Sequence, residues 1–369
     1  MTMNTTPEKI LLIINPVSGR MKSTSGLYEI LDELYRDDAV DTADAAEISL
    51  PLTESEAEKA PVKSVAKAPA KVSPLPSLAS GNAGPLGGEP NPNRRVTVAL
   101  TMHRGHATQL ASAAAAEGYD TVICCGGDGT FNETVAGLMT IERKSRPVLG
   151  YIPAGSTNDF AASMGLSGTL REAARVTVSD HQTRIDIGHF RPLGMNHPPA
   201  RHFSYIASFG AFTATSYSTS QAAKNLFGHL AYLVAGIKDL GNIQAHHAAF
   251  DLQDGTRVEG DFIFGAVTNT TSAGGVIKLP SDLVSLSDGL LELFLIHMPK
   301  TALDLQRIAT ALLAQDFSGC PLIELHHIKS VRILMDDCLS WSLDGEEAIG
   351  GKRIEIGCHG GAVRLKTRA

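Results

Sequence analysis

The stretch TVICCGGDGTFNE, residues 121–133, decides the fold of this chain. It begins with a short apolar, β-branched run, passes through Gly126, Gly127 and Gly129, and leads into a helical pattern over residues 130–139. A short buried strand, a glycine-rich turn and a helix are the unit from which parallel sheets covered by helices are built. In such sheets, ligands bind beyond the carboxyl ends of the strands, which is where this turn would lie.

The same alternation continues on both sides of this stretch. Apolar runs at residues 10–14, 96–100 and 148–152 predict three more strands, and helical patterns cover residues 25–35 and 106–117. Strands that alternate with helices indicate an α/β fold with a doubly wound, mostly parallel sheet. We therefore predict a nucleotide-binding α/β domain over residues 1–165.

Residues 51–93 interrupt this domain and differ from everything around them. The 43 residues hold 8 of the 18 prolines of the chain and no aromatic residue. Such a composition cannot bury enough apolar area to offset the entropy lost on ordering, which predicts a flexible surface insertion. A spacer or a regulatory tether fits the pattern.

Strand-like runs dominate the second half of the chain. They cover residues 183–190, 202–208, 261–269, 290–297, 328–335, 352–357 and 362–366, with helices expected over residues 221–240 and 301–315. This texture predicts a mostly β, antiparallel sandwich domain over residues 166–369, whose last residues pack back on the first domain.

Composition limits the class of protein. The 32 basic and 39 acidic side chains give a net charge of −7, which provides no global positive field for nucleic acid. No apolar run approaches the roughly 20 residues of a membrane span, and no signal peptide is visible at the start. Five cysteines without a Cys-x-x-Cys pair favour reduced thiols and a cytoplasmic location.

Three turns combine glycine with short polar side chains at predicted carboxyl ends of strands, at residues 15–20, 126–133 and 153–160. Glycine lets the backbone approach a ligand and turn its N–H groups toward an anion, and a helix start adds free donors. These turns therefore predict a phosphate site. Asp128 would repel bare phosphate, which indicates a divalent cation or a hydroxyl proton beside it. The spacing matches neither a P-loop nor a dinucleotide fingerprint.

These turns resemble the catalytic domain of the diacylglycerol kinase and lipid kinase family, which includes sphingosine and ceramide kinases. The matching segments are Asn15-Pro16-Val17-Ser18-Gly19, Gly126-Gly127-Asp128-Gly129-Thr130 with Asn132-Glu133, Pro153-Ala154-Gly155-Ser156-Thr157-Asn158-Asp159-Phe160, Ser287-Asp288-Gly289-Leu290-Leu291 and Leu343-Asp344-Gly345-Glu346. Gly-Gly-Asp-Gly alone is shared with NAD kinases and phosphofructokinases, whereas the ordered set is more specific.

The resemblance implies an NAD kinase-like and phosphofructokinase-like α/β domain, a C-terminal β-sandwich, and an active site in the cleft between them. It implies ATP and Mg²⁺ as cofactors. Carried over by position, the residues expected to bind the nucleotide are Asn15, Pro16, Val17, Ser18, Gly19, Thr101, Gly126, Gly127, Asp128, Gly129, Thr130, Phe131, Asn132, Glu133, Gly155, Ser156, Asn158 and Asp159. Asp288, with the carbonyls of Ser285 and Leu290, matches a mainly structural magnesium site; an ordinary Asp-Gly turn is the alternative.

The chain departs from the family pattern at Ala162, where many members carry Arg. A positive charge that would stabilise bound phosphate is missing there, so Arg20, Arg104 or another basic residue has to supply it. Phosphoryl transfer to a hydroxyl also needs a proton acceptor. Our hypothesis is that Glu346 accepts the proton, supported by Asp344, while Asp128 organises magnesium or the acceptor.

The most direct interpretation is an ATP-dependent kinase that converts diacylglycerol to phosphatidic acid during transient contact with the inner membrane surface, attracted there by local Lys and Arg. The alternatives are an NAD kinase-like or other small-molecule kinase, and a nucleotide- or lipid-binding regulator without turnover. The lipid preference and the oligomeric state, a homodimer included, stay open.

Overall fold

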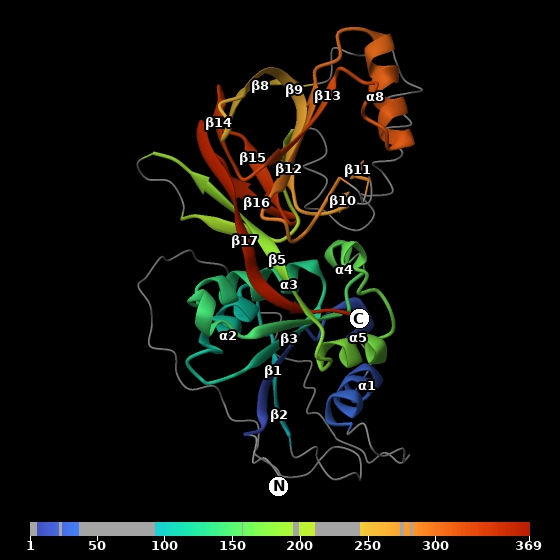
Figure 1. Ribbon diagram of the computed structural model, residues 1–369, viewed down its shortest axis with the longest axis vertical. Coiled ribbons are helices and arrows are strands. Elements are labelled where there is room, and N and C mark those ends of the chain that lie inside the picture. Colours follow the sequence, from blue (N-terminus) through green and yellow to red (C-terminus); the bar gives the residue numbers. More distant parts are fainter. Residues whose placement is uncertain are drawn as a thin grey trace, which may run out of the picture.

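Four parallel strands form the sheet in the lower half of Figure 1, in the order β2-β1-β3-β4. Their bounds are β1 (Glu8–Ile14), β2 (Arg94–Leu100), β3 (Thr121–Gly126) and β4 (Val148–Pro153). This computed structural model describes residues 6–21, 24–36, 93–156, 158–194, 199–210, 244–273, 277–280 and 283–369. The predicted insertion, apart from Asn93, and the predicted helix over residues 221–240 lie outside the described residues.

Helices cover both faces of this sheet because successive side chains of its strands point to opposite faces. Leu12 belongs to the apolar cluster that contains Leu34 of α1, whereas Leu11 belongs to the cluster that contains Phe131 of α3. The helices on the first face are α1 (Thr24–Tyr35) and α5 (Leu170–Thr177), and those on the second face are α2 (His106–Ala113) and α3 (Asp128–Met139). The doubly wound α/β architecture is confirmed.

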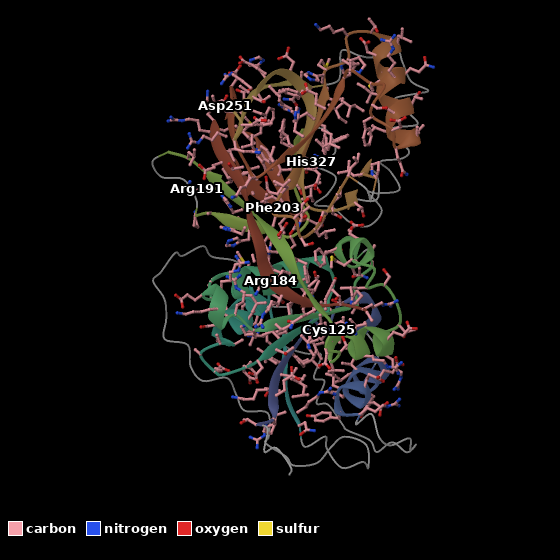
Figure 2. All side chains as sticks on the ribbon, viewed as in Figure 1. Cys125, Arg184, Arg191, Phe203, Asp251 and His327 are labelled. Carbon is pink, nitrogen blue, oxygen red and sulfur yellow. The ribbon has the colours of Figure 1, made fainter. Side chains whose placement is uncertain are left out.

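The upper half of Figure 1 is built mainly from antiparallel strands. They are β5 (Gln182–Pro192), β6 (Arg201–Phe203), β7 (Ile206–Gly210), β8 (His246–Leu252), β9 (Arg257–Thr268), β12 (Leu291–His297), β13 (Ile323–Ile328), β14 (Ser330–Met335), β15 (Ser340–Leu343), β16 (Glu346–Ile349) and β17 (Arg353–Lys366). Trp341, Phe190 and Phe209 pack together in the core of this sandwich-like half. In Figure 2, Phe203 and Asp251 lie in this half and Cys125 lies in the parallel half.

Six further elements complete the described chain. They are η1 (Gly19–Met21), η2 (Arg143–Ser145), α4 (Asp159–Ser163), α8 (Ala302–Ala314), β10 (Ser272–Ala273) and β11 (Ile277–Lys278). The predicted helix over residues 301–315 is therefore α8, which begins with a capping box between Thr301 and Asp304.

Two strands continue from one half into the other. β5 and β17 pair along most of their length, and Leu365 near the end of β17 pairs in parallel with Leu149 of β4. A single sheet therefore runs through both halves. The predicted strands at residues 352–357 and 362–366 are one strand with an irregularity between His359 and Val363.

Two other predicted strands are divided in the structure. The run over residues 328–335 is interrupted between β13 and β14, and the run over residues 202–208 is interrupted between β6 and β7. The second break has a clear cause, because the backbone N–H groups of Ser204, Tyr205 and Ile206 all donate to the carboxylate of Asp344. A distant side chain thus folds a turn that the local pattern could not reveal.

Candidate active site

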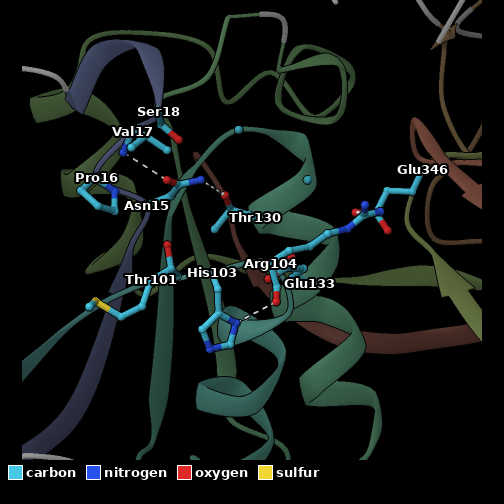
Figure 3. Close-up of a pocket in the computed structure, with 13 residues that line it drawn as sticks. Asn15, Pro16, Val17, Ser18, Thr101, His103, Arg104, Thr130, Glu133 and Glu346 are labelled. Atoms are coloured by element: carbon cyan, nitrogen blue, oxygen red, sulfur yellow. Dashed lines mark hydrogen bonds and ion pairs between the residues drawn. The ribbon is translucent and has the colours of Figure 1, made fainter. Parts of the chain in front are cut away.

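The first glycine-containing turn is tied to the second through an amide side chain. Asn15 follows β1, and its Nδ2 donates to Oγ1 of Thr130 at 3.0 Å, as Figure 3 shows. Its Oδ1 accepts the backbone N–H of Val17 at 3.2 Å, which fixes the turn. The two loops are therefore held side by side before any ligand arrives.

The second and third turns contact each other through Gly127 and Gly155. A Cβ atom added to Gly155 would lie 2.5 Å from Cα of Gly127, closer than side-chain carbons approach a backbone. The contact therefore requires glycine at this position. Asn158, in a left-handed conformation with φ 54°, accepts the Gly155 N–H and donates to its carbonyl, so the third turn is closed on itself.

Asp128 is turned toward the third turn. Its carboxylate accepts the backbone N–H of Asp159 at 3.2 Å and that of Phe160 at 3.4 Å, at the start of α4. Burial raises the pKa of Asp128 despite these donors. Burial, and then the charge of Asp128, raises the pKa of Asp159 to about 6. The charge of Asp128 therefore disfavours ionisation of Asp159.

A pocket of about 450 Å³ opens in front of the first two turns. Its lining, drawn in Figure 3, comprises Asn15, Pro16, Val17, Ser18, Thr101, Met102, His103, Arg104, Gly127, Gly129, Thr130, Glu133 and Glu346. The volume is in the usual range for a small-molecule site. Since Glu346 belongs to β16 and the other residues to the first half of the chain, both halves contribute to the pocket.

Glu133 holds one wall of this pocket in place. Its Oε1 accepts the N–H of Gly105 at 2.7 Å and its Oε2 that of Ala107 at 3.3 Å, so α3 fixes the turn that leads into α2. Gly105 has φ +81°, a conformation that side chains disfavour. Thr101, at the start of this turn, donates its N–H to the carbonyl of Ile14 at 2.8 Å.

Glu346 is held between two arginines. Its Oε1 lies 3.0 Å from a guanidinium nitrogen of Arg104, and its Oε2 lies 2.9 Å from one of Arg201. The hydrogen bond and the charge of Glu346 raise the pKa of Arg104. Figure 3 shows Arg104 reaching across the pocket toward Glu346. The carboxylate therefore stays at the pocket while one of its partners belongs to the opposite half.

Asp344 lies deeper than Glu346. It is 4% exposed, and Oδ2 accepts the N–H of Ser204 at 2.5 Å while Oδ1 accepts those of Tyr205 at 3.1 Å and Ile206 at 2.9 Å. Burial raises its pKa to about 7, against the lowering effect of the three N–H donors. Asp344 and Gly345 have φ of 50° and 82°, which a tight turn between β15 and β16 requires.

The structure separates the predicted nucleotide-binding and catalytic residues into those that line the pocket and those outside its lining. Ten predicted residues line it: Asn15, Pro16, Val17, Ser18, Thr101, Gly127, Gly129, Thr130, Glu133 and Glu346. Those outside the lining are Gly19, Gly126, Asp128, Phe131, Asn132, Gly155, Ser156, Asn158, Asp159 and Asp344. Phe131 differs most from the prediction, because its ring packs on Tyr151 and Phe160 in the core.

Three residues at the site were not among those predicted to act there. Met102 and His103 line the pocket, and their position directly after Thr101 in the same turn was the available signal. Arg201 contacts Glu346 from β6, and nothing in its sequence surroundings indicates this role.

None of the predicted magnesium ligands lines this pocket. Oδ1 of Asp288 accepts the N–H of Leu290 at 2.9 Å, while Asp186 accepts that of Gly289 at 2.6 Å. Both carboxylate oxygens of buried Glu292 lack a hydrogen-bond partner, and burial, then the charges of Asp288 and Asp186, raise its pKa to about 8. Oxygen donors beside an unpartnered buried carboxyl suit a hard cation.

The site of one carboxylate and the carbonyls of Ser285 and Leu290 nevertheless stays a prediction. Among the described residues, no three His, Cys, Asp or Glu side chains gather closely enough to hold a metal ion.

None of the helices in the described parts of the chain has the length and apolar character that a membrane span needs.

Comparison with known proteins agrees with this geometry. Residues 90–190 match the model of the diacylglycerol kinase catalytic domain, and residues 207–366 match that of the YegS C-terminal NAD kinase beta sandwich-like domain. The chain is 32% identical to a diacylglycerol kinase of Bacillus subtilis (strain 168) over 272 residues, 73% of this chain and 86% of that protein. It is 32% identical to a diacylglycerol kinase of Staphylococcus aureus (strain JH9) over 248 residues, 67% of this chain and 74% of that protein.

A solved structure shares the fold. The crystal structure of a diacylglycerol kinase from Bacillus anthracis str. Sterne superposes with a TM-score of 0.63 at 19% identity, covering 99% of this chain and 98% of that one. The predicted resemblance, fold class and enzyme class are thereby confirmed. This chain belongs to the diacylglycerol kinase family and is a lipid kinase.

Proposed function

We propose that this enzyme transfers the γ-phosphoryl group of ATP to the hydroxyl of a membrane lipid, and that diacylglycerol is the acceptor and phosphatidic acid the product. The observation that supports this most is the presence of Glu346 in the same pocket as Gly127 and Gly129. Phosphoryl transfer needs groups that bind the phosphates and a proton acceptor within one site. The glycine-containing turn and Glu346 bring these two together.

The ATP phosphates would lie against the first two turns. Gly127 precedes α3, whose first N–H groups have no partner within the helix and carry the positive end of its dipole. Residues 15–18 and the hydroxyl of Thr130 lie beside them. The names of the relatives support a kinase, and the choice of ATP as donor rests on this arrangement.

Glu346 is the proposed proton acceptor because it lines the pocket, whereas both oxygens of Asp344 are occupied by backbone donors inside the protein. Glu346 takes the proton of the acceptor hydroxyl. The hydroxyl oxygen then bonds to the γ-phosphorus, and the bond from that phosphorus to the β,γ-bridging oxygen breaks to release ADP. Asp344 holds the turn that precedes Glu346, which makes it a positioning residue here.

Magnesium enters this proposal at two places. Bound with ATP, it neutralises charge that develops on the phosphoryl oxygens. Asp288 and the carbonyls of Ser285 and Leu290 would hold a second, structural ion. Asp128, which lies in the second turn, keeps the third turn against the second by accepting the backbone N–H groups of Asp159 and Phe160.

The test is incubation with γ-labelled ATP and an acceptor panel of diacylglycerol, sphingosine, ceramide and NAD. We expect labelled phosphatidic acid, at a rate that rises on anionic vesicles and falls with salt. Glu346→Gln should lower turnover by about 10²–10⁴-fold, the usual contribution of a general base, while ATP binding is kept. The control is Glu347→Gln, since the Glu347 carboxylate instead accepts from Oγ of Ser340 at 2.8 Å.

Three results would contradict the proposal in different ways. Label on NAD alone would indicate a small-molecule kinase. ATP binding without product on any acceptor would indicate a regulator. Full activity of Glu346→Gln would move the proton acceptor to Asp344 or Asp128.

A further inference from the structure

Arg104 is the only Lys or Arg that lines the pocket in the described parts of the chain. The lining also contains two carboxylates, those of Glu133 and Glu346. A triphosphate brought into this pocket needs a cation, and Ala162, where the family resemblance leads one to expect Arg, supplies none. Of the described lining residues, Arg104 therefore has the charge that the ligand requires.

The backbone under Arg104 is fixed while its side chain is exposed. Glu133 accepts the N–H groups of Gly105 and Ala107, and the N–H of Met102 donates to Nδ1 of His106 at 3.0 Å. The Arg104 side chain is 74% exposed and ends in the ion pair with Glu346. A long side chain on an anchored turn can change partners by rotating its own bonds, without movement of the loop.

Glu346 does not depend on Arg104 for its position. Arg201, whose side chain is 34% exposed, holds the other carboxylate oxygen and also donates to the carbonyl of Glu347 at 2.8 Å. This second bond anchors Arg201 to the strand that carries Glu346. If Arg104 leaves, Oε2 of Glu346 keeps its partner and Oε1 becomes free.

Exchange of partners is favourable for Arg104. An ion pair as exposed as that between Arg104 and Glu346 is screened by water and salt, so breaking it costs little. A nucleoside triphosphate offers several negative charges and paired oxygen acceptors that match a guanidinium. Arg104 would therefore bind the incoming phosphate in preference to the single carboxylate.

We propose that Arg104 releases Glu346 when ATP binds and then contacts its terminal phosphates, so that nucleotide binding itself uncovers Oε1 of the proton acceptor. This inference rests on the proposed function. It makes Arg104 a catalytic residue for phosphate binding and Arg201 the positioning residue that keeps Glu346 in place. It also implies an order of events, in which ATP prepares the site for the hydroxyl.

The experiment compares binding of a non-hydrolysable ATP analogue and of AMP by calorimetry in the full-length wild type and in Arg104→Gln, Arg104→Lys and Arg201→Gln. Arg104→Gln should weaken binding of the analogue at least tenfold, about 1.4 kcal/mol, and binding of AMP less than twofold. Arg104→Lys should recover part of the loss. Arg201→Gln should keep analogue binding within twofold and lower kcat instead.

Arg332→Gln is the matched control. Arg332 lies on β14, its side chain is 75% exposed, and its Nε lies 3.8 Å from a carboxylate oxygen of Glu355 on β17. The variant therefore repeats the chemical change outside the pocket lining. Thermal melts of all variants should agree with the wild type, because the altered arginines are exposed or partly exposed. Normal analogue binding by Arg104→Gln, or equal losses for the analogue and AMP, would overturn this inference alone. A wild type that binds neither nucleotide would instead overturn the proposed function.

Discussion

Replacing Asp344 by Asn tests whether burial or hydrogen bonding decides the charge of this carboxyl group. The side chain is 4% exposed, which favours the neutral form, while three backbone N–H groups point at it, which favours the anion. Burial is the larger effect and raises the pKa of Asp344 to about 7. Asn has the same shape but carries no charge at any pH.

The sign follows from linkage. The unfolded chain releases the Asp344 proton near its ordinary pKa of about 4, whereas the folded chain keeps it until about pH 7. The stabilisation is thus fully present below pH 4 and is lost as the pH rises through 7. Three units at 1.36 kcal/mol each give a loss of about 4 kcal/mol. The free energy of unfolding of the wild type, minus that of Asp344→Asn, should fall by this amount between pH 4 and pH 8.

Urea unfolding at several pH values, followed by the fluorescence of Trp341, measures this difference. Trp341 is the single tryptophan of the chain and is buried close to Asp344 in sequence. Asp316→Asn is the control, since Asp316 is exposed and accepts bonds from Ser318 that lower its pKa, so its difference should rise slightly with pH. A difference for Asp344→Asn that stays flat or rises with pH would show that the N–H donors keep the carboxylate charged, which refutes the reasoning.

Two other predictions concern the turns and the cation site. Gly155→Ala should lower the free energy of unfolding, measured by urea titration, by about 1–3 kcal/mol, as overpacking does, because the new methyl would collide with Gly127. Gly319→Ala is the control and should be nearly neutral in the same titration, because no atom lies within 4 Å of its added Cβ. Asp288→Ala should abolish a magnesium-dependent rise in melting temperature that the wild type shows; an equal rise in both proteins would place the structural ion elsewhere.

Much of the phosphate-binding part could be predicted from the sequence, because its signals are local. Gly127, Gly129 and Thr130 lie within four residues of one another. Gly126, just before them, is required by the turn itself, because an added Cβ would lie 2.6 Å from the Thr130 side chain. The strand before them is apolar on both faces, which the sequence pattern also shows. Parallel strands then bring the first two turns to the same sheet edge without further information.

The acidic part of the site could be predicted only by residue and not by arrangement. Whether Asp344 or Glu346 faces the pocket depends on Ser204, Tyr205 and Ile206, which lie about 140 residues earlier and occupy the Asp344 oxygens. Arg201 reaches Glu346 across the same separation. Contacts between segments so far apart leave no periodic pattern, which is also why the break between β6 and β7 was not expected.

The paired strands β5 and β17 determine how the two halves can move relative to each other. Two hydrogen-bonded strands resist the free rotation that a single connecting peptide would allow. Opening of the pocket therefore has to bend the β5–β17 strand pair. The ladder loses its regular register between His359 and Val363, and Gly361 there has φ of 54°. Amide hydrogens near this interruption should exchange with solvent before those of the flanking segments, which would identify it as the hinge between the two halves.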